Sequence, residues 1–109
     1  MAAAAITIIE NPATIESDAT GAVITKALRN MSGYLCNLGT ADVFMFASVD
    51  DRVPATTAAV AVTNAQAQQI FVLPAGASMP WLRSYNSIAH KTASGTAVLI
   101  WYPEYSVGR

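Results

Sequence analysis

Residues 42–49 read Asp-Val-Phe-Met-Phe-Ala-Ser-Val, and this stretch decides the fold class. In an extended chain, alternate side chains point to opposite sides. One side then carries Val43, Met45, Ala47 and Val49, and the other carries Phe44 and Phe46. Because valine and aromatic residues favour pleated strands, the stretch predicts a β-strand that is apolar on both faces.

Runs of the same kind recur along the chain, separated at short intervals by Gly, Pro, Asn and Asp. Many short strands at close spacing are typical of all-β folds. We therefore predict an all-β fold, an antiparallel β-sandwich or a small barrel, with an N-terminal extended segment. The predicted strands are Ile6–Glu10, Ala22–Leu28, Gly33–Asn37, Asp42–Val49, Ala58–Thr63, Gln68–Leu73, Met79–Arg83, Ser87–Thr92 and Thr96–Tyr102.

Three connections between predicted strands contain residues that favour turns. Residues 37–40 (Asn-Leu-Gly-Thr) predict a three-residue hairpin with Gly39 at positive φ. Pro74-Ala75-Gly76 predicts a type I turn with proline at its second position and glycine at its fourth. Residues 93–96 (Ala-Ser-Gly-Thr) predict a hairpin loop between two alternating runs. Glu16-Ser17-Asp18 is interpreted as an acidic, turn-forming stretch.

The composition bounds the domain and its partners. The chain has 109 residues, 53% of them hydrophobic and only 12% charged, with a net charge of −1. We expect one β-sandwich domain over residues 21–109, with residues 1–20 as an N-terminal arm or edge strand. Intrinsic disorder and electrostatic binding to nucleic acid are excluded by this composition, and no membrane span or signal peptide is expected.

Strands that are apolar on both faces need other residues to cover the face that points away from the core. Either long loops or the N-terminal segment of the same chain supply it, or another subunit does, and we favour another subunit. The residues predicted at a subunit interface are Phe44, Phe46, Trp81, Arg83, Trp101, Tyr102 and Tyr105. Ile6, Ile8 and Ile9 are the predicted contacts of an arm that pairs with a neighbour's sheet edge; the favoured alternative is that residues 6–9 form the first strand of their own sheet.

Residues for catalysis or metal binding are scarce. His90 is the only histidine and Cys36 the only cysteine, so neither a His-rich nor a Cys-rich metal site is expected within one chain. Ser94 follows His90 by four residues, but no acid is placed to orient the ring. Asp50-Asp51 is interpreted as a solvated turn. We therefore predict no enzyme activity and no cofactor.

Three segments resemble small bacteriophage virion proteins. They are Tyr34–Val43, with its Asn-Leu-Gly-Thr-Ala turn, Val72-Leu73-Pro74-Ala75-Gly76, and Ala93-Ser94-Gly95-Thr96-Ala97. The resemblance implies a β-sandwich or jelly-roll component of the virion, assembled in the host cytoplasm. It also implies that the chain is a capsid decoration (cement) protein. The implied partners are copies of the chain itself, with a trimer favoured, and the major capsid protein.

Two alternatives stay open. One is a tail, neck or fibre-associated virion protein. The other is a carbohydrate- or receptor-binding module that uses aromatic side chains such as Trp81 and Tyr85 as a platform.

Overall fold

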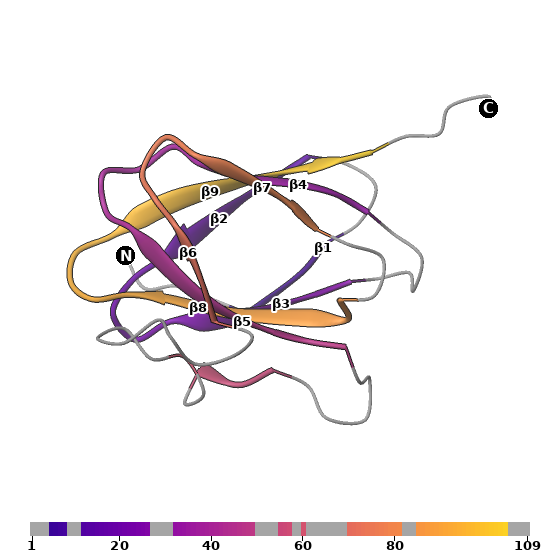
Figure 1. The fold of residues 1–109 in the computed structure, drawn as a ribbon, viewed down its shortest axis with the longest axis horizontal. Helices are drawn as coiled ribbons and strands as arrows, with labels where there is room; N and C mark the ends of the chain where they lie inside the picture. The colour runs from indigo at the N-terminus through magenta and orange to yellow at the C-terminus, as the bar shows by residue number, and fades with distance from the viewer. Residues whose placement is uncertain are drawn as a thin grey trace.

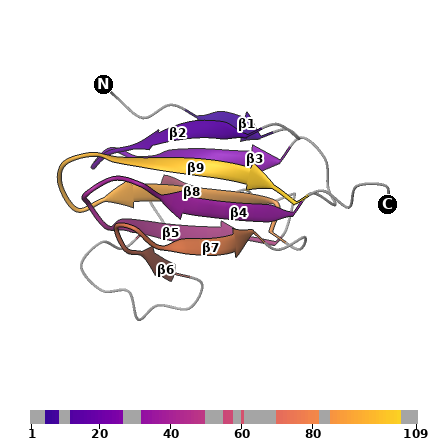
Figure 2. The same cartoon turned by 90° about the horizontal axis from the view of Figure 1, so that it is seen from above.

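The computed structural model describes residues 5–8, 12–26, 32–49, 55–57, 60, 70–81 and 85–104. They form two facing sheets (Figures 1 and 2). The five-stranded sheet has the order β1-β3-β8-β5-β6, with strands Ile6–Ile8, Ala22–Lys26, Ser87–Thr92, Val43–Ser48 and Ile70–Leu73. The four-stranded sheet has the order β2-β9-β4-β7, with strands Ala13–Ser17, Ala97–Pro103, Gly33–Asn37 and Ser78–Trp81.

The strands pair as a nested antiparallel set: β2 with β9, β3 with β8, β4 with β7 and β5 with β6. Strand β9 also pairs with β4, and β8 with β5, which joins the nested pairs into two sheets. Apart from β5 and β6, successive strands lie in opposite sheets. This arrangement is a jelly roll, and it confirms the predicted all-β, sandwich or jelly-roll-like fold.

The core lies between the sheets and is built by alternation along the strands. Leu35 and Leu99 point inward from the four-stranded sheet, and Ile24, Met45 and Ile88 from the five-stranded sheet. All five side chains are fully buried, which is the main stabilising contribution available to a chain of this length.

The two tryptophans are core residues, and their prediction as interface residues is wrong. Trp81 and Trp101 have no exposed area, and their rings pack edge to face with centroids 5.9 Å apart. The indole Nε1 of Trp81 donates to the carbonyl of Tyr85 at 2.9 Å, which satisfies its buried polar group. Their alternation within β7 and β9 points them between the sheets, where no other subunit reaches them.

Strand β2 was not predicted. The interpretation of Glu16 and Ser17 as turn residues is wrong, because Ala13–Ser17 pairs with β9 over its whole length. Asp18 does act as a turn residue before Gly21, since its Oδ1 accepts from Thr20 N and Gly21 N. Ile15 and Ser17 are buried while Thr14 is exposed and Glu16 half-buried, which is the alternation of a strand with one solvated face.

Strands β4 and β8 match their predicted bounds, and the other predicted strands that the structure describes differ at one or both ends. Of the predicted strand 58–63, the structure describes only Val60, which lies in no strand.

The predicted hairpins are corners between the sheets. Strands β4 and β5 lie in opposite sheets, and so do β8 and β9. Gly39 is not among the described glycines with positive φ; a Cβ there would lie 2.7 Å from Ala97 Cα, so a close approach requires glycine. At the β6–β7 corner, Ala77 N donates to Pro74 O at 3.0 Å, which makes Pro74 the first residue of the turn and Gly76, with φ of 82°, the third. That is the glycine position of a type II turn and not the predicted type I turn.

Part of the outer face of the five-stranded sheet is covered by the chain itself. Ala55 and Val60 are buried against Ala89, with Phe44 and Phe46 half-buried beside them. The amide of Ala55 donates to Ser87 Oγ at 2.8 Å, which fastens this segment to β8. Of the two covers considered for Phe44 and Phe46, the structure therefore shows the loop of the same chain.

The N-terminal isoleucines belong to the sandwich. Ile6 and Ile8 lie in β1, which pairs in parallel with β3, and Ile8 is fully buried in the core. The prediction that they contact a neighbour as an arm is wrong, and the alternative of a strand in their own sheet is correct. Ile9 lies outside the described residues, as do Asp50, Asp51, Arg83 and Tyr105.

Candidate interaction surface

The outer face of the four-stranded sheet is the candidate functional surface. Its side chains follow from the register: Tyr34 stands between Pro80 and Tyr102, and Cys36 between Ser78 and Ile100. The backbone amide of Leu38 donates to Val98 O at 2.9 Å, which continues the ladder by one step. The face thus runs from Tyr34 and Tyr102 at one end to Leu38 and Val98 at the other. We call it the β4–β9 face.

Large apolar side chains stay exposed on the β4–β9 face. Tyr34 is 47% exposed, Tyr102 45%, Leu38 64% and Val98 36%. These are four of the six large hydrophobic residues that are exposed in the described part of the chain. Scattered single residues of this kind need no explanation, but a contiguous patch usually marks a contact surface.

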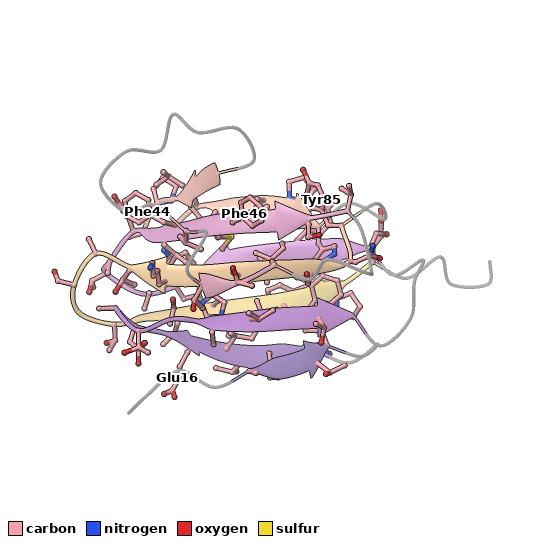
Figure 3. The ribbon with its side chains drawn as sticks, turned by 90° about the horizontal axis from the view of Figure 1, so that it is seen from below. Glu16, Phe44, Phe46 and Tyr85 are labelled. Atoms are coloured by element: carbon pink, nitrogen blue, oxygen red, sulfur yellow. The ribbon has the colours of Figure 1, made fainter. Side chains whose placement is uncertain are left out.

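The β4–β9 face is almost free of charge. Glu16, in register with Val98, is the one carboxylate that its described strands place on it; the exposed Glu104 follows β9 at the Tyr102 end, where its amide donates to Ser32 O at 2.9 Å. Glu16 lies at the sandwich edge formed by β1 and β2, away from Phe44 and Phe46 on β5 (Figure 3). A small open pocket of about 240 Å³ lies at that edge and is lined by Ala5, Ile6, Thr14, Ile15 and Glu16.

Of the predicted interface residues that the structure describes, Tyr102 alone lies on this face. Tyr34, Leu38, Val98 and Ile100 were missed. For β9 a signal existed, because Val98, Ile100 and Tyr102 alternate with Ala97, Leu99 and Trp101. Without the tertiary structure, nothing tells which of two apolar sets faces inward.

A buried polar pair crosses the core beneath the β1–β2 edge. His90 Nδ1 on β8 and Ser17 Oγ on β2 lie 2.8 Å apart, and both residues are fully buried. His90 Nε2 has no hydrogen-bond partner among the described residues. Burial lowers the pKa of His90 from 6.5 to about 4, and the negative charge of Asp18 offsets part of this effect. Ser94, four residues after His90, is exposed in the β8–β9 corner.

No metal centre is assembled from the part of the chain that the structure describes: nowhere there do three His, Cys, Asp or Glu side chains come together. Within the same residues, no helix has the length and apolar character needed to cross a membrane.

Comparison with known proteins gives the fold alone. No family model matches the chain, and no curated protein matches it either. Among solved structures it is similar to HppE with cobalt(II) in complex with substrate, with 19% identity and a TM-score of 0.51. It is also similar to hydroxypropylphosphonic acid epoxidase from S. wedmorenis in complex with fosfomycin, with 18% identity and a TM-score of 0.53. Each likeness covers 86% of this chain but only 43% and 42% of those chains, so the protein spans less than half their length.

These likenesses contradict the predicted function. The chains that share the fold are those of an epoxidase, and none of the matches is a capsid decoration, tail, neck or fibre protein, or an adsorption module. The physical reason is local. The three segments that carried the resemblance contain the β4–β5, β6–β7 and β8–β9 corners, and a jelly roll of any function needs small and turn-forming residues at such corners.

Proposed function

We propose that the protein is a non-catalytic jelly-roll module that associates with copies of itself through the β4–β9 face. The observation that carries this proposal is the asymmetry between the two outer faces. On the five-stranded sheet, the chain covers the large aromatic side chains Phe44 and Phe46 with its own Ala55 and Val60. On the four-stranded sheet, Tyr34, Leu38 and Tyr102 stay exposed.

The size of the face supports a reversible association. Four strands about 4.8 Å apart and five residues at about 3.3 Å each span roughly 300 Å². A standard interface buries about 800 Å² on each partner, so this face alone favours a concentration-dependent contact over a permanent one.

The low charge of the β4–β9 face favours a second copy of the chain as its binding partner. A strongly charged partner would lose hydration against Tyr34, Ile100 and Val98 without gaining an ion pair. The same face of another copy is equally neutral and of equal size. The net charge of −1 also produces little repulsion between copies.

The chemistry of the epoxidase is not proposed for this chain. HppE was solved with cobalt(II), and such a metal takes imidazole and carboxylate ligands together. The sole imidazole here, that of His90, is buried between the sheets and hydrogen-bonded to Ser17, and no three potential ligands meet within the described residues. These residues do not fit the metal, so no metal-dependent step is derived.

Two matched valines test the proposal. Val98 lies on the β4–β9 face and is 36% exposed, whereas Val72 lies on the five-stranded sheet beside Phe44 and is 39% exposed. We expect sedimentation velocity over a dilution series to show association of the wild type and of Val72→Lys. Val98→Lys should associate at least tenfold more weakly, because it buries an unpaired ammonium group.

Circular dichroism and thermal unfolding check that both variants are folded. A wild type that remains monomeric at all concentrations, or a folded Val98→Lys that associates as the wild type does, overturns the proposal.

A further inference from the structure

We propose that Ser17 and His90 form a proton-sensitive latch, which holds β2 against the five-stranded sheet and releases it when His90 is protonated. The latch is a property of the single chain and goes beyond the proposed self-association. It rests on the hydrogen bond between the sheets and on the ring nitrogen that has no partner among the residues that the structure describes.

The neutral ring is the form that this core accommodates. It carries one N–H and one lone pair, and the bond with Ser17 Oγ uses one nitrogen whichever tautomer is present. On protonation, the ring nitrogen that carries only a lone pair takes up a proton from solvent, and both ring nitrogens are then hydrogen-bond donors. Ser17 Oγ accepts one of the two N–H groups, and the Nε2–H of a charged ring then has no acceptor among the described residues.

The surroundings of His90 do little to stabilise that charge. Its register neighbours within the five-stranded sheet are Ala22 on β3 and Met45 on β5, neither of which is titratable. On β8 itself, Lys91 alternates to the opposite side of the strand. Asp18, which follows β2, is the charged group whose attraction favours the protonated ring.

The part that moves is β2 and the residues after it. Strand β8 is held between β3 and β5, whereas β2 is an edge strand that pairs with β9 alone. The corner after β2 is tied to the core by Thr92 N, which donates to Asp18 O at 2.9 Å. Asp18 Oδ1 accepts from Thr20 N at 3.0 Å and Gly21 N at 2.8 Å. Opening at this edge exposes His90 to water while the central strands stay paired.

The expected size of the effect follows from the ring's two environments. With a pKa of about 4 when the latch is closed and an ordinary value of 6.5 when it is open, the open form should be roughly 25-fold more populated at pH 5 than at pH 7.

Hydrogen exchange read by mass spectrometry, corrected for the intrinsic pH dependence of exchange, tests the latch in dilute protein. Protection of residues 13–17 should fall about 25-fold from pH 7 to pH 5, while that of β4 and β5, which do not pair with β2, changes little. In His90→Gln, which carries no titratable ring, this selective loss should be absent. Asp18→Asn keeps an acceptor oxygen but removes the charge that favours the protonated ring in the closed latch, so opening should begin at the same pH and continue to increase to lower pH than in the wild type.

A titration of the wild type keeps the test independent of how the variants fold. His90 is the sole histidine, so its ring signal in proton NMR is unambiguous. A pKa well below 6.5, with line broadening in β2 amides over the same pH range, supports the latch. An unshifted ring pKa, equal loss of protection in all strands, or the same selective loss in His90→Gln overturns it. Because the protein is dilute, these outcomes do not depend on self-association.

Discussion

The side-chain amide of Asn37, at the end of β4, donates a hydrogen bond to the carbonyl of Leu73, at the end of β6, over 3.0 Å. This bond ties the two sheets together where two corners meet. The same amide donates to Ala41 O at 2.9 Å, and Asn37 Oδ1 accepts from Gly39 N at 2.9 Å. Gly76 N donates to the backbone carbonyl of Asn37 at 2.7 Å, which brings in the second corner.

Replacement of this buried asparagine should be costly. Asn37→Ala removes three side-chain hydrogen bonds and leaves the Leu73 carbonyl buried without that donor, so we expect a loss of about 3 kcal/mol in the free energy of unfolding. Urea unfolding at pH 7 measures it. Asn86→Ala is the matched control, because the side-chain bond of Asn86 to Val49 O is exposed, and the variant should lose less than about 1 kcal/mol. Equal losses in the two variants would contradict a role of Asn37 at the corners.

Stability should depend on pH through His90. Its pKa is about 4 in the folded chain and 6.5 ordinarily, so the unfolded chain binds more protons between these values. The contribution of His90 to the free energy of unfolding is therefore fully present above about pH 6.5. It is lost as the pH falls toward 4, which lowers the free energy of unfolding by about 3 kcal/mol. Urea unfolding at several pH values measures the slope. His90→Gln should show a shallower slope, and an unchanged slope would assign the dependence to other groups.

Two glycines should respond differently to alanine. A Cβ at Gly33 would collide with the ring of Trp101 and the carbonyl of Tyr102, so Gly33→Ala should cost more than about 2 kcal/mol. At Gly76 no atom lies within 4 Å of such a Cβ, and only the positive φ is unfavourable, so Gly76→Ala should cost about 1 kcal/mol. Thermal unfolding ranks the two. A Gly33→Ala chain as stable as Gly76→Ala would contradict the close packing of β4 on Trp101.

Cys36 should report on the β4–β9 face. It is half-buried near the middle of that face and is the only cysteine, so any thiol labelling belongs to it. We expect labelling by a small thiol reagent to slow several-fold as protein concentration rises, because association removes the thiol from solvent. In Val98→Lys the rate should stay constant. If the labelling rate of the wild type does not change with protein concentration, Cys36 does not lie in a contact between copies.

Local patterns predicted the strands better than the contacts between them. Strands β4 and β8 were correct to the residue, because apolar β-prone runs end there at turn-forming residues. Strand β2 was missed because its single large apolar residue, Ile15, is flanked by Thr14 and Glu16, and only pairing with β9 makes this segment extended. The aromatic residues were misplaced for a related reason: alternation separates two faces of a strand but does not say which one is buried.

By itself, the sequence determined an all-β domain with short strands, sharp corners and more apolar surface than one interior requires. Only the tertiary structure decided that β4 and β5, or β8 and β9, lie in opposite sheets. The reason is that turn residues set the local direction of the backbone over a few residues, whereas sheet partners such as β2 and β9 are about 80 residues apart and are chosen by burial of the whole core. The same global choice left Tyr34 and Tyr102 outside, Trp81 and Trp101 inside, and Phe44 and Phe46 beside the chain's own loop.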